Sequence, residues 1–193
     1  LNRFHWHLTD DQGWRIEISA FPKLTELASM RPFSNFGRSM EYGPHGGYYT
    51  KSDIREIVAF CAERHITVIP EIEMPGHASA LLSAYPEYSC DGKPVAVKTR
   101  GGVYADTLCA GKEETYAALE AILMEVMELF PGKQIHLGGD EAPKDHWKAC
   151  PLCQRKMRQE GLKSEVELQC WFTDRMAAFL KSHGREAVVW NDA

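Results

Sequence analysis

Two adjacent acidic residues, Asp140 and Glu141, are the strongest candidates for chemistry in this sequence. They follow the short apolar run at 134–137 and the pair Gly138-Gly139. Neighbouring carboxyl groups rarely ionise together, so one can keep a proton to donate while the other supplies fixed negative charge. Side chains of adjacent strand residues point to opposite faces, so both acids share one pocket only where the strand turns into a loop, which glycines permit. The alternative is a solvated acidic loop or helix start.

His5 and His7 form a second candidate pair. Residues i and i+2 of a strand share a face, so both rings could bind one metal ion. The alternative is two inward-facing polar residues that hydrogen-bond inside a barrel. Asp10 and Asp11 come just beyond and could hold these rings or take part in a site themselves.

His77 ends a rigid turn at 70–77 that follows another β-branched run. Its ring could orient a carboxylate or bind a substrate, although a lone histidine is often structural. Glu71 and Glu73 precede it, and they could equally be inward ion pairs of a barrel, which look the same in a sequence.

Trp190 ends the last apolar run of the chain. A tryptophan at the mouth of a barrel suits the apolar face of a sugar ring, and a core tryptophan is the alternative. The same ambiguity applies to Trp147, whereas Trp6 and Trp14 are interpreted as structural.

The six cysteines are too few for a disulfide scaffold. The pair Cys150-x-x-Cys153 is a weak zinc signal because no second pair has matching spacing, so free thiols or a loop staple are favoured. Cys90 and Cys109 flank a polar loop and could form a disulfide in an oxidising compartment. Cys61 and Cys170 lie at helical spacing and are predicted to be buried thiols.

Secondary-structure elements must position these candidate residues, and the hydrophobic periodicity predicts strands that alternate with helices. The predicted strands are 2–9, 66–69, 134–137 and 187–190. The predicted helices are 22–30, one that starts at a Thr50–Asp53 capping box and runs through Cys61, 113–130, and one that starts after Ser164 and ends near Gly184. Residues 31–49 and 86–112 are predicted to be long loops.

Alternating strands and helices imply parallel strands joined by helical crossovers. Five candidate residues follow the carboxyl end of a strand, which is where a (β/α)8 TIM barrel carries its active site: Asp10, His77, Asp140, Glu141 and Trp190. A doubly wound sheet obeys a similar rule, but the sequence has no glycine-rich phosphate loop. Four strands make roughly half of a barrel. We therefore predict an α/β fold in which residues 1–193 are one partial catalytic domain.

The bulk composition excludes some function classes. A net charge of −5 argues against nucleic acid as the main partner. No apolar run approaches the ~20 residues of a membrane span. The chain starts inside a strand pattern and stops just after another, so we expect it to be a segment of a longer protein.

Three motifs in order, at 2–15, 69–77 and 136–141, resemble the β-N-acetylhexosaminidases of glycoside hydrolase family 20. The similarity runs along essentially the whole chain. It implies a retaining exo-glycosidase that removes terminal GlcNAc or GalNAc and needs no metal or cofactor. In this family the 2-acetamido oxygen of the substrate attacks the anomeric carbon and forms an oxazolinium intermediate.

The resemblance also implies a role for each matching residue. Glu141 would be the general acid and then the base that activates water. Asp140 would hold the acetamido N–H. Asp10 and His77 would support and position the acid, and Trp190 would wall the acetamido pocket.

The sequence departs from the family pattern in one mild respect, because Glu73 stands where many members have Asp. The resemblance assigns the chain to about strands two to five. The sugar-binding arginine of the family would lie upstream of Leu1, and further substrate-binding residues would lie beyond Ala193. We therefore expect the activity from the parent protein and only weak activity from the isolated segment, whose sheet edges stay open.

Three alternatives remain open from sequence. The first is a lacto-N-biosidase-like glycosidase, which releases a disaccharide. The second is a metal-dependent hydrolase that uses His5 and His7. The third is an inactive carbohydrate-binding fragment. Oligomeric state is not indicated by the sequence, and a secreted, periplasmic or lysosomal location is implied by the resemblance alone.

Overall fold

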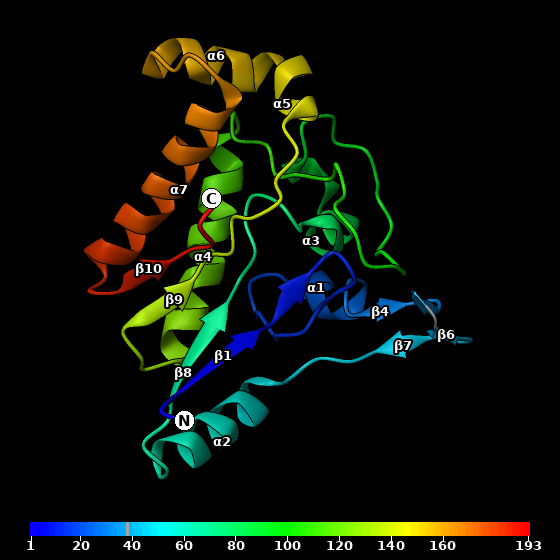
Figure 1. Ribbon diagram of the computed structural model, residues 1–193, viewed down its shortest axis with the longest axis vertical. Coiled ribbons are helices and arrows are strands. Elements are labelled where there is room, and N and C mark those ends of the chain that lie inside the picture. Colours follow the sequence, from blue (N-terminus) through cyan, green and yellow to red (C-terminus); the bar gives the residue numbers. More distant parts are fainter. Residues whose placement is uncertain (38) are drawn as a thin grey trace.

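A computed structural model describes residues 1–37 and 39–193, and its centre is one four-stranded parallel sheet (Figure 1). The strands are β1 (Arg3–His7), β8 (Thr67–Glu71), β9 (Gln134–His136) and β10 (Glu186–Val188). They lie in the order β1-β8-β9-β10, and each pair is parallel. Strand order therefore follows chain order without the reversal of a doubly wound sheet. The predicted α/β fold, with a parallel sheet that covers part of a TIM barrel, is confirmed.

Three long helices cross over between these strands: α2 (Lys51–Ala62), α4 (Glu113–Leu129) and α7 (Glu165–Ser182). The predicted capping box is present at the start of α2, where the side chains of Thr50 and Asp53 exchange hydrogen bonds with each other's backbone N–H. Ser164 caps α7 by accepting from the N–H of Glu167. In Figure 1, α4 packs behind the sheet and α7 lies beside β10.

Several short elements were not predicted from the sequence. Three are helices: α3 (Ser79–Ala84), α5 (Asp145–Ala149) and α6 (Pro151–Glu160). The predicted helix 22–30 shortens to α1 (Lys23–Glu26), and η1 (Pro86–Tyr88) is a single 3-10 turn inside the predicted loop 86–112. Strands β2 (Thr9–Asp10) and β3 (Gly13–Trp14) pair as a tight hairpin directly after β1.

The prediction that residues 31–49 form a loop without structure was wrong in part. Two small antiparallel pairs lie there: β4 (Met30–Arg31) with β7 (His45–Gly46), and β5 (Ser34–Phe36) with β6 (Ser39–Glu41). Their residues are mostly exposed, so they carry no hydrophobic alternation that a sequence reading could detect. Arg38, within this predicted loop, lies outside the described residues.

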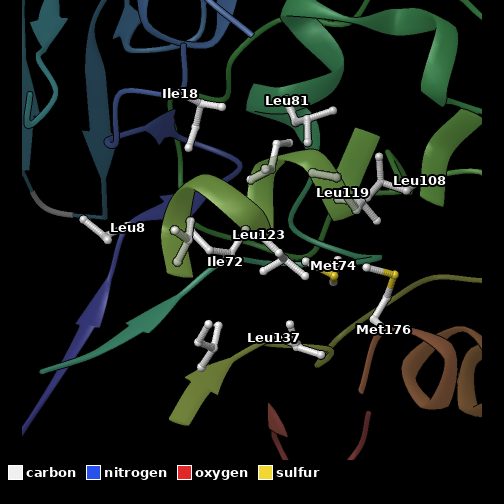
Figure 2. Packing of buried hydrophobic residues seen from close by; sticks show 14 of the residues in the cluster. Leu8, Ile18, Ile72, Met74, Leu81, Leu108, Leu119, Leu123, Leu137 and Met176 are labelled. Atoms are coloured by element: carbon white, nitrogen blue, oxygen red, sulfur yellow. The ribbon is translucent and has the colours of Figure 1, made fainter. Parts of the chain in front are cut away.

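The core lies between the sheet and its helices (Figure 2). Leu137 from the end of β9 faces Leu119 and Leu123 of α4, and Met176 of α7 closes the same cluster. The six residues predicted for the apolar face of α4 are all buried: Tyr116, Leu119, Leu123, Val126, Met127 and Phe130. This packing fixes the sheet, and the sheet in turn fixes the loops at its carboxyl edge.

The tryptophan predictions are confirmed, since Trp6 and Trp14 are buried, and Trp147 is buried as well. The cysteine predictions were partly wrong. Cys61 is buried, but Cys170 is exposed, because it lies on the side of α7 opposite Leu168 and Phe172. No disulfide joins Cys90 to Cys109, and all six cysteines are free. Among the described residues, no helix is both long and apolar enough to cross a membrane.

Candidate active site

The predicted site residues meet at the carboxyl edge of the sheet. His77 follows β8, Asp140 and Glu141 follow β9, and Trp190 follows β10. Asp10 lies in the hairpin after β1. Parallel strands bring their carboxyl ends to one edge, which explains why residues up to 180 positions apart, Asp10 and Trp190, belong to one region.

His77 connects the acids of this edge. Its Nδ1 lies 3.2 Å from Asp10 Oδ1 and 3.0 Å from Asp11 Oδ2. Its Nε2 lies 3.7 Å from Asp140 Oδ2 and 3.6 Å from Glu141 Oε2. The imidazole, from the segment after β8, therefore stands between two pairs of carboxyl groups, one pair after β1 and one pair after β9.

The surrounding carboxylates decide the charge of His77. The hydrogen bond to Asp10, followed by that to Asp11, raises the pKa of His77 to about 11 despite its burial. Burial would raise the pKa of Asp10, but the hydrogen bonds from His77 and from the backbone N–H of Asp11 lower it overall. At neutral pH the site thus holds a cationic imidazolium against an ionised Asp10.

The backbone is unusual at the two residues on either side of this contact. His77 has φ of 48° and Glu141 has φ of 46°, in the left-handed region that L side chains with a Cβ seldom adopt. Such conformations cost of order 1–3 kcal/mol each and concentrate at functional sites. The fold therefore stabilises a costly backbone shape to bring His77 and Glu141 together.

Gly138 and Gly139 are required by this turn, as the sequence predicted. Both have positive φ, of 67° and 96°. A Cβ at Gly138 would also overlap the carboxylate of Glu73, and one at Gly139 would crowd Ala193. The glycine pair thus permits both the turn and the close approach of the Glu73 side chain and of Ala193.

Trp190 is held by a buried carboxylate. Its Nε1 donates to Glu71 Oε1 at 2.8 Å, and its ring contacts the ring of His136 at a centroid distance of 4.8 Å. The opposite oxygen of Glu71 lies 2.6 Å from His5 Nε2. Burial opposes ionisation of Glu71, but hydrogen bonds led by His136 outweigh it and lower the pKa to about 2. Glu71 is therefore a structural anion that orients Trp190, whose side chain stays partly exposed.

The comparisons with known proteins assign the chain to a family. The model of the glycosyl hydrolase family 20 catalytic domain matches residues 1–193. The chain belongs to glycosyl hydrolase family 20. A β-hexosaminidase of Porphyromonas gingivalis is 47% identical over 192 residues, which cover 100% of this chain and 24% of that relative.

Two solved structures of the family resemble the fold. The β-N-acetylhexosaminidase from Bacteroides fragilis superposes with a TM-score of 0.86 at 43% identity, over 100% of this chain and 36% of that one. The exo β-N-acetylglucosaminidase from Vibrio harveyi, solved with N-acetylglucosamine, gives a TM-score of 0.84 at 33% identity, over 100% and 32%. The chain thus spans about a quarter to just over a third of these family members.

Three residues around this candidate site were missed or left open by the sequence reading. Asp11 is buried and binds both His77 Nδ1 and the N–H of Ser79. Gln169, buried on α7, donates to the carbonyl of Gly139 at 2.7 Å. Asp192 accepts from the N–H of Glu141 at 3.3 Å. Asp11 lies within the first motif, but nothing in the sequence connects Gln169 with the glycine turn.

His5 and His7 do not form the shared ligand pair that was one possibility from the sequence. Among the described residues they belong to separate groups, His5 with Glu71 and His136, and His7 with Glu71 and Glu73. They share a face of β1 as expected, but each points at a different carboxylate, His5 at Glu71 in β8 and His7 at Glu73 just after it. The alternative reading, inward polar residues that hydrogen-bond inside the barrel, describes them correctly.

Glu73 leads to a prediction about pH and stability. It is buried, one oxygen lies 3.4 Å from His7 Nε2, and the other has no hydrogen-bond partner among the described residues. Desolvation, more than any other cause, raises the pKa of Glu73 from 4.5 to about 8. The folded state therefore holds this proton more tightly than the unfolded state does, and its contribution to stability is lost as the pH rises from 4.5 through 8.

We expect Glu73→Gln to flatten the decline of stability over this pH window. The measurement is the urea concentration at the midpoint of unfolding, for wild type and variant, at several pH values between pH 5 and pH 8. Glu128→Gln, an exposed change on α4, should keep the wild-type slope. An identical slope for wild type and Glu73→Gln would show that Glu73 does not carry this titration.

Proposed function

We propose that the full-length protein carrying this chain is a retaining exo-β-N-acetylhexosaminidase that removes terminal β-linked GlcNAc or GalNAc from glycans. The observation that carries the proposal is His77, a cation held by Asp10 and Asp11 on one side and facing Asp140 and Glu141 on the other. Membership of family 20 and the relative from Vibrio harveyi, solved with N-acetylglucosamine, support it.

Glu141 suits the role of general acid and base. Its side chain is 52% exposed at the carboxyl edge of the sheet, and Oε2 lies 3.6 Å from His77 Nε2. A substrate oxygen could therefore reach the carboxyl group, while His77 restrains its position. Glu141 would protonate the departing oxygen and later take a proton from water.

Asp140 suits the role of acetamido acceptor because one of its oxygens lacks a partner. Asp140 Oδ1 is buried without a hydrogen bond among the described residues. A buried acceptor left unpaired costs about 1–3 kcal/mol. The N–H of a bound acetamido group would satisfy this oxygen, and the negative charge would polarise the amide so that its carbonyl oxygen becomes a better nucleophile.

Asp10 and His77 would then act as positioning residues and Trp190 as an apolar wall. Asp10 keeps His77 charged, and the charged ring holds Asp140 and Glu141 at the turn. Trp190 has an indole that is fixed by Glu71 yet 41% exposed, and an exposed aromatic face packs well against the acetamido methyl group and the sugar ring.

The proposed reaction balances in two steps. In the first, the acetamido oxygen forms a bond to the anomeric carbon, the glycosidic bond breaks, and the proton of Glu141 goes to the leaving oxygen. In the second, water attacks the anomeric carbon of the oxazolinium ion, the bond from that carbon to the acetamido oxygen breaks, and Glu141 takes a proton from the water, which restores the acetamido group. Two inversions give retention of the β configuration.

The experiment is a series of aryl β-N-acylglucosaminides in which the acetyl group carries none, one, two or three fluorine atoms. Fluorine withdraws electrons from the amide oxygen, so kcat/KM should fall at each step if that oxygen is the nucleophile. A flat series would refute substrate assistance. No turnover of any member by the full-length protein would favour an inactive binding protein, and turnover of a disaccharide substrate alone would favour a lacto-N-biosidase-like enzyme.

A further inference from the structure

Four cysteines come together in the segments that follow β8 and β9: Cys90, Cys109, Cys150 and Cys153. Cys90 Sγ lies 3.9 Å from Cys153 Sγ, and Cys109 Sγ lies 3.8 Å from Cys150 Sγ and 3.6 Å from Cys153 Sγ. All four sulfur atoms lie within 4.8 Å of one another. The proposed glycosidase chemistry uses none of them.

Loop contacts bring the first two cysteines together. Ser89 and Leu108 form an antiparallel bridge, and the N–H of Cys109 donates to the carbonyl of Tyr88 at 2.8 Å. This pairing sets Cys90 and Cys109 side by side, although they are far apart in sequence. Lys112 Nζ donates to the carbonyl of Ser89 at 2.6 Å and holds the same turn.

The other two cysteines belong to the first turn of α6. Cys150 is the N-cap residue, Pro151 follows it, and Cys153 occupies the third helical position. The first turn packs directly on the other loop, since a Cβ at Gly111 would overlap the backbone of Leu152 and Cys153. A glycine at position 111 thus permits the close approach of the two segments.

We propose that Cys90, Cys109, Cys150 and Cys153 bind one structural Zn²⁺ ion. A tetrahedral site with Zn–S bonds of about 2.3 Å has sulfur–sulfur edges of about 3.8 Å. The three observed separations, 3.6, 3.8 and 3.9 Å, match that edge. They are far longer than the ~2.05 Å of a disulfide, and Cys109 has two sulfur neighbours, whereas a disulfide would give it one.

The surroundings suit a closed site that stabilises thiolates. Cys109, Cys150 and Cys153 are buried, and Cys90 is half-buried. The N-terminus of α6 directs its positive end at the C-x-x-C pair. Four protein ligands would leave no open position for water or substrate, so the metal has no catalytic role.

The metal would fasten the loop that supports the active-site turn. The N–H of Leu108, next to Cys109, donates to the carbonyl of Pro75 at 2.9 Å, and Pro75 is two residues before His77. Trp147 Nε1 donates to the carbonyl of Leu108, also at 2.9 Å. A metal ion bound by Cys109 would therefore hold α5, α6 and the turn that contains Pro75 and His77 in fixed positions relative to each other.

The test measures metal in the full-length protein, purified without chelators, by elemental mass spectrometry. We expect one zinc per chain, and X-ray absorption should show four sulfur ligands at about 2.3 Å. Cys153→Ser and Cys90→Ser should lose the zinc and lower Tm. The exposed Cys170→Ser, which lies outside the cluster, should keep both zinc and Tm.

Metal content is independent of glycosidase activity, so the two proposals fail separately. Glu141→Gln should retain zinc even when turnover is lost. If Cys153→Ser does not fold, replacing zinc by Co²⁺ in the wild type should give the visible absorption of a tetrahedral thiolate complex. Zinc-free protein with four reactive thiols would overturn the proposal, as would an intact mass lowered by two hydrogens per disulfide.

Discussion

Replacing Glu141 by Gln is expected to reduce kcat/KM of the full-length protein by about 10²–10⁴, the usual contribution of a positioned acid or base. Glutamine preserves the shape of the side chain but cannot donate or accept the catalytic proton. The contact with His77 Nε2, at 3.6 Å, is too long for a strong hydrogen bond, so its loss should change stability little. Hydrolysis of an aryl β-N-acetylglucosaminide measures the effect.

The rate loss in Glu141→Gln should also depend on the leaving group, which makes the assignment of the general acid more specific. A phenol with strong electron-withdrawing groups departs without much protonation, so the loss should be smaller for it than for an alkyl glycoside. Azide needs no general base, so added azide should speed the second step and yield a β-glycosyl azide. Glu114→Gln, an exposed change in the first turn of α4, is the matched control. A wild-type rate for Glu141→Gln would refute the assignment.

The main strands and long helices could be predicted well from the sequence because they depend on local patterns, namely hydrophobic periodicity and helix caps. Periodicity identified all four strands of the sheet, and caps identified the starts of α2 and α7. It missed α3, whose six residues are too few to show a helical period. It also missed α6, a mostly polar helix with only Cys153 and Met157 buried.

The contacts of the site could be predicted only in part, because they depend on the register between strands. The shared face of His5 and His7 follows from a period of two. Which carboxylate each ring meets depends on the β1–β8 register, in which His7 pairs with Glu71 and His5 with Ile69. No local pattern encodes that alignment, so the sequence left a shared metal open as an alternative to two separate hydrogen bonds.

The cysteine cluster is a second case in which contacts between distant segments could not be predicted from a local sequence pattern. Cys150 and Cys153 were visible as a pair, but Cys90 and Cys109 join them through a loop bridge and the close packing of Gly111 on α6. Spacing along the chain separates these residues, and tertiary contacts bring them together. A sequence reading therefore finds the two pairs separately but cannot bring them into one cluster.

Replacing Asp140 by Asn should lower kcat/KM by about 10²–10³, the range for removing one preorganised electrostatic contact to the reacting group. Asp140 Oδ1 is buried and has no hydrogen-bond partner among the described residues, and in the proposed complex an acetamido N–H would supply one. Asparagine can still accept this hydrogen bond through its amide oxygen, but it has no charge to polarise the amide. The loss should therefore appear mainly in kcat.

The fluorinated substrates separate this role from a general disturbance of the turn. If Asp140 assists the acetamido oxygen, the steep dependence of rate on fluorine number in the wild type should change in Asp140→Asn, because less charge then develops on the amide in the transition state. Glu141→Gln should keep the wild-type dependence on fluorine number for activated leaving groups, because the attack itself is intact. A parallel loss for every substrate in Asp140→Asn would contradict the role, and would indicate that the charge of Asp140 serves only to hold His77, 3.7 Å away.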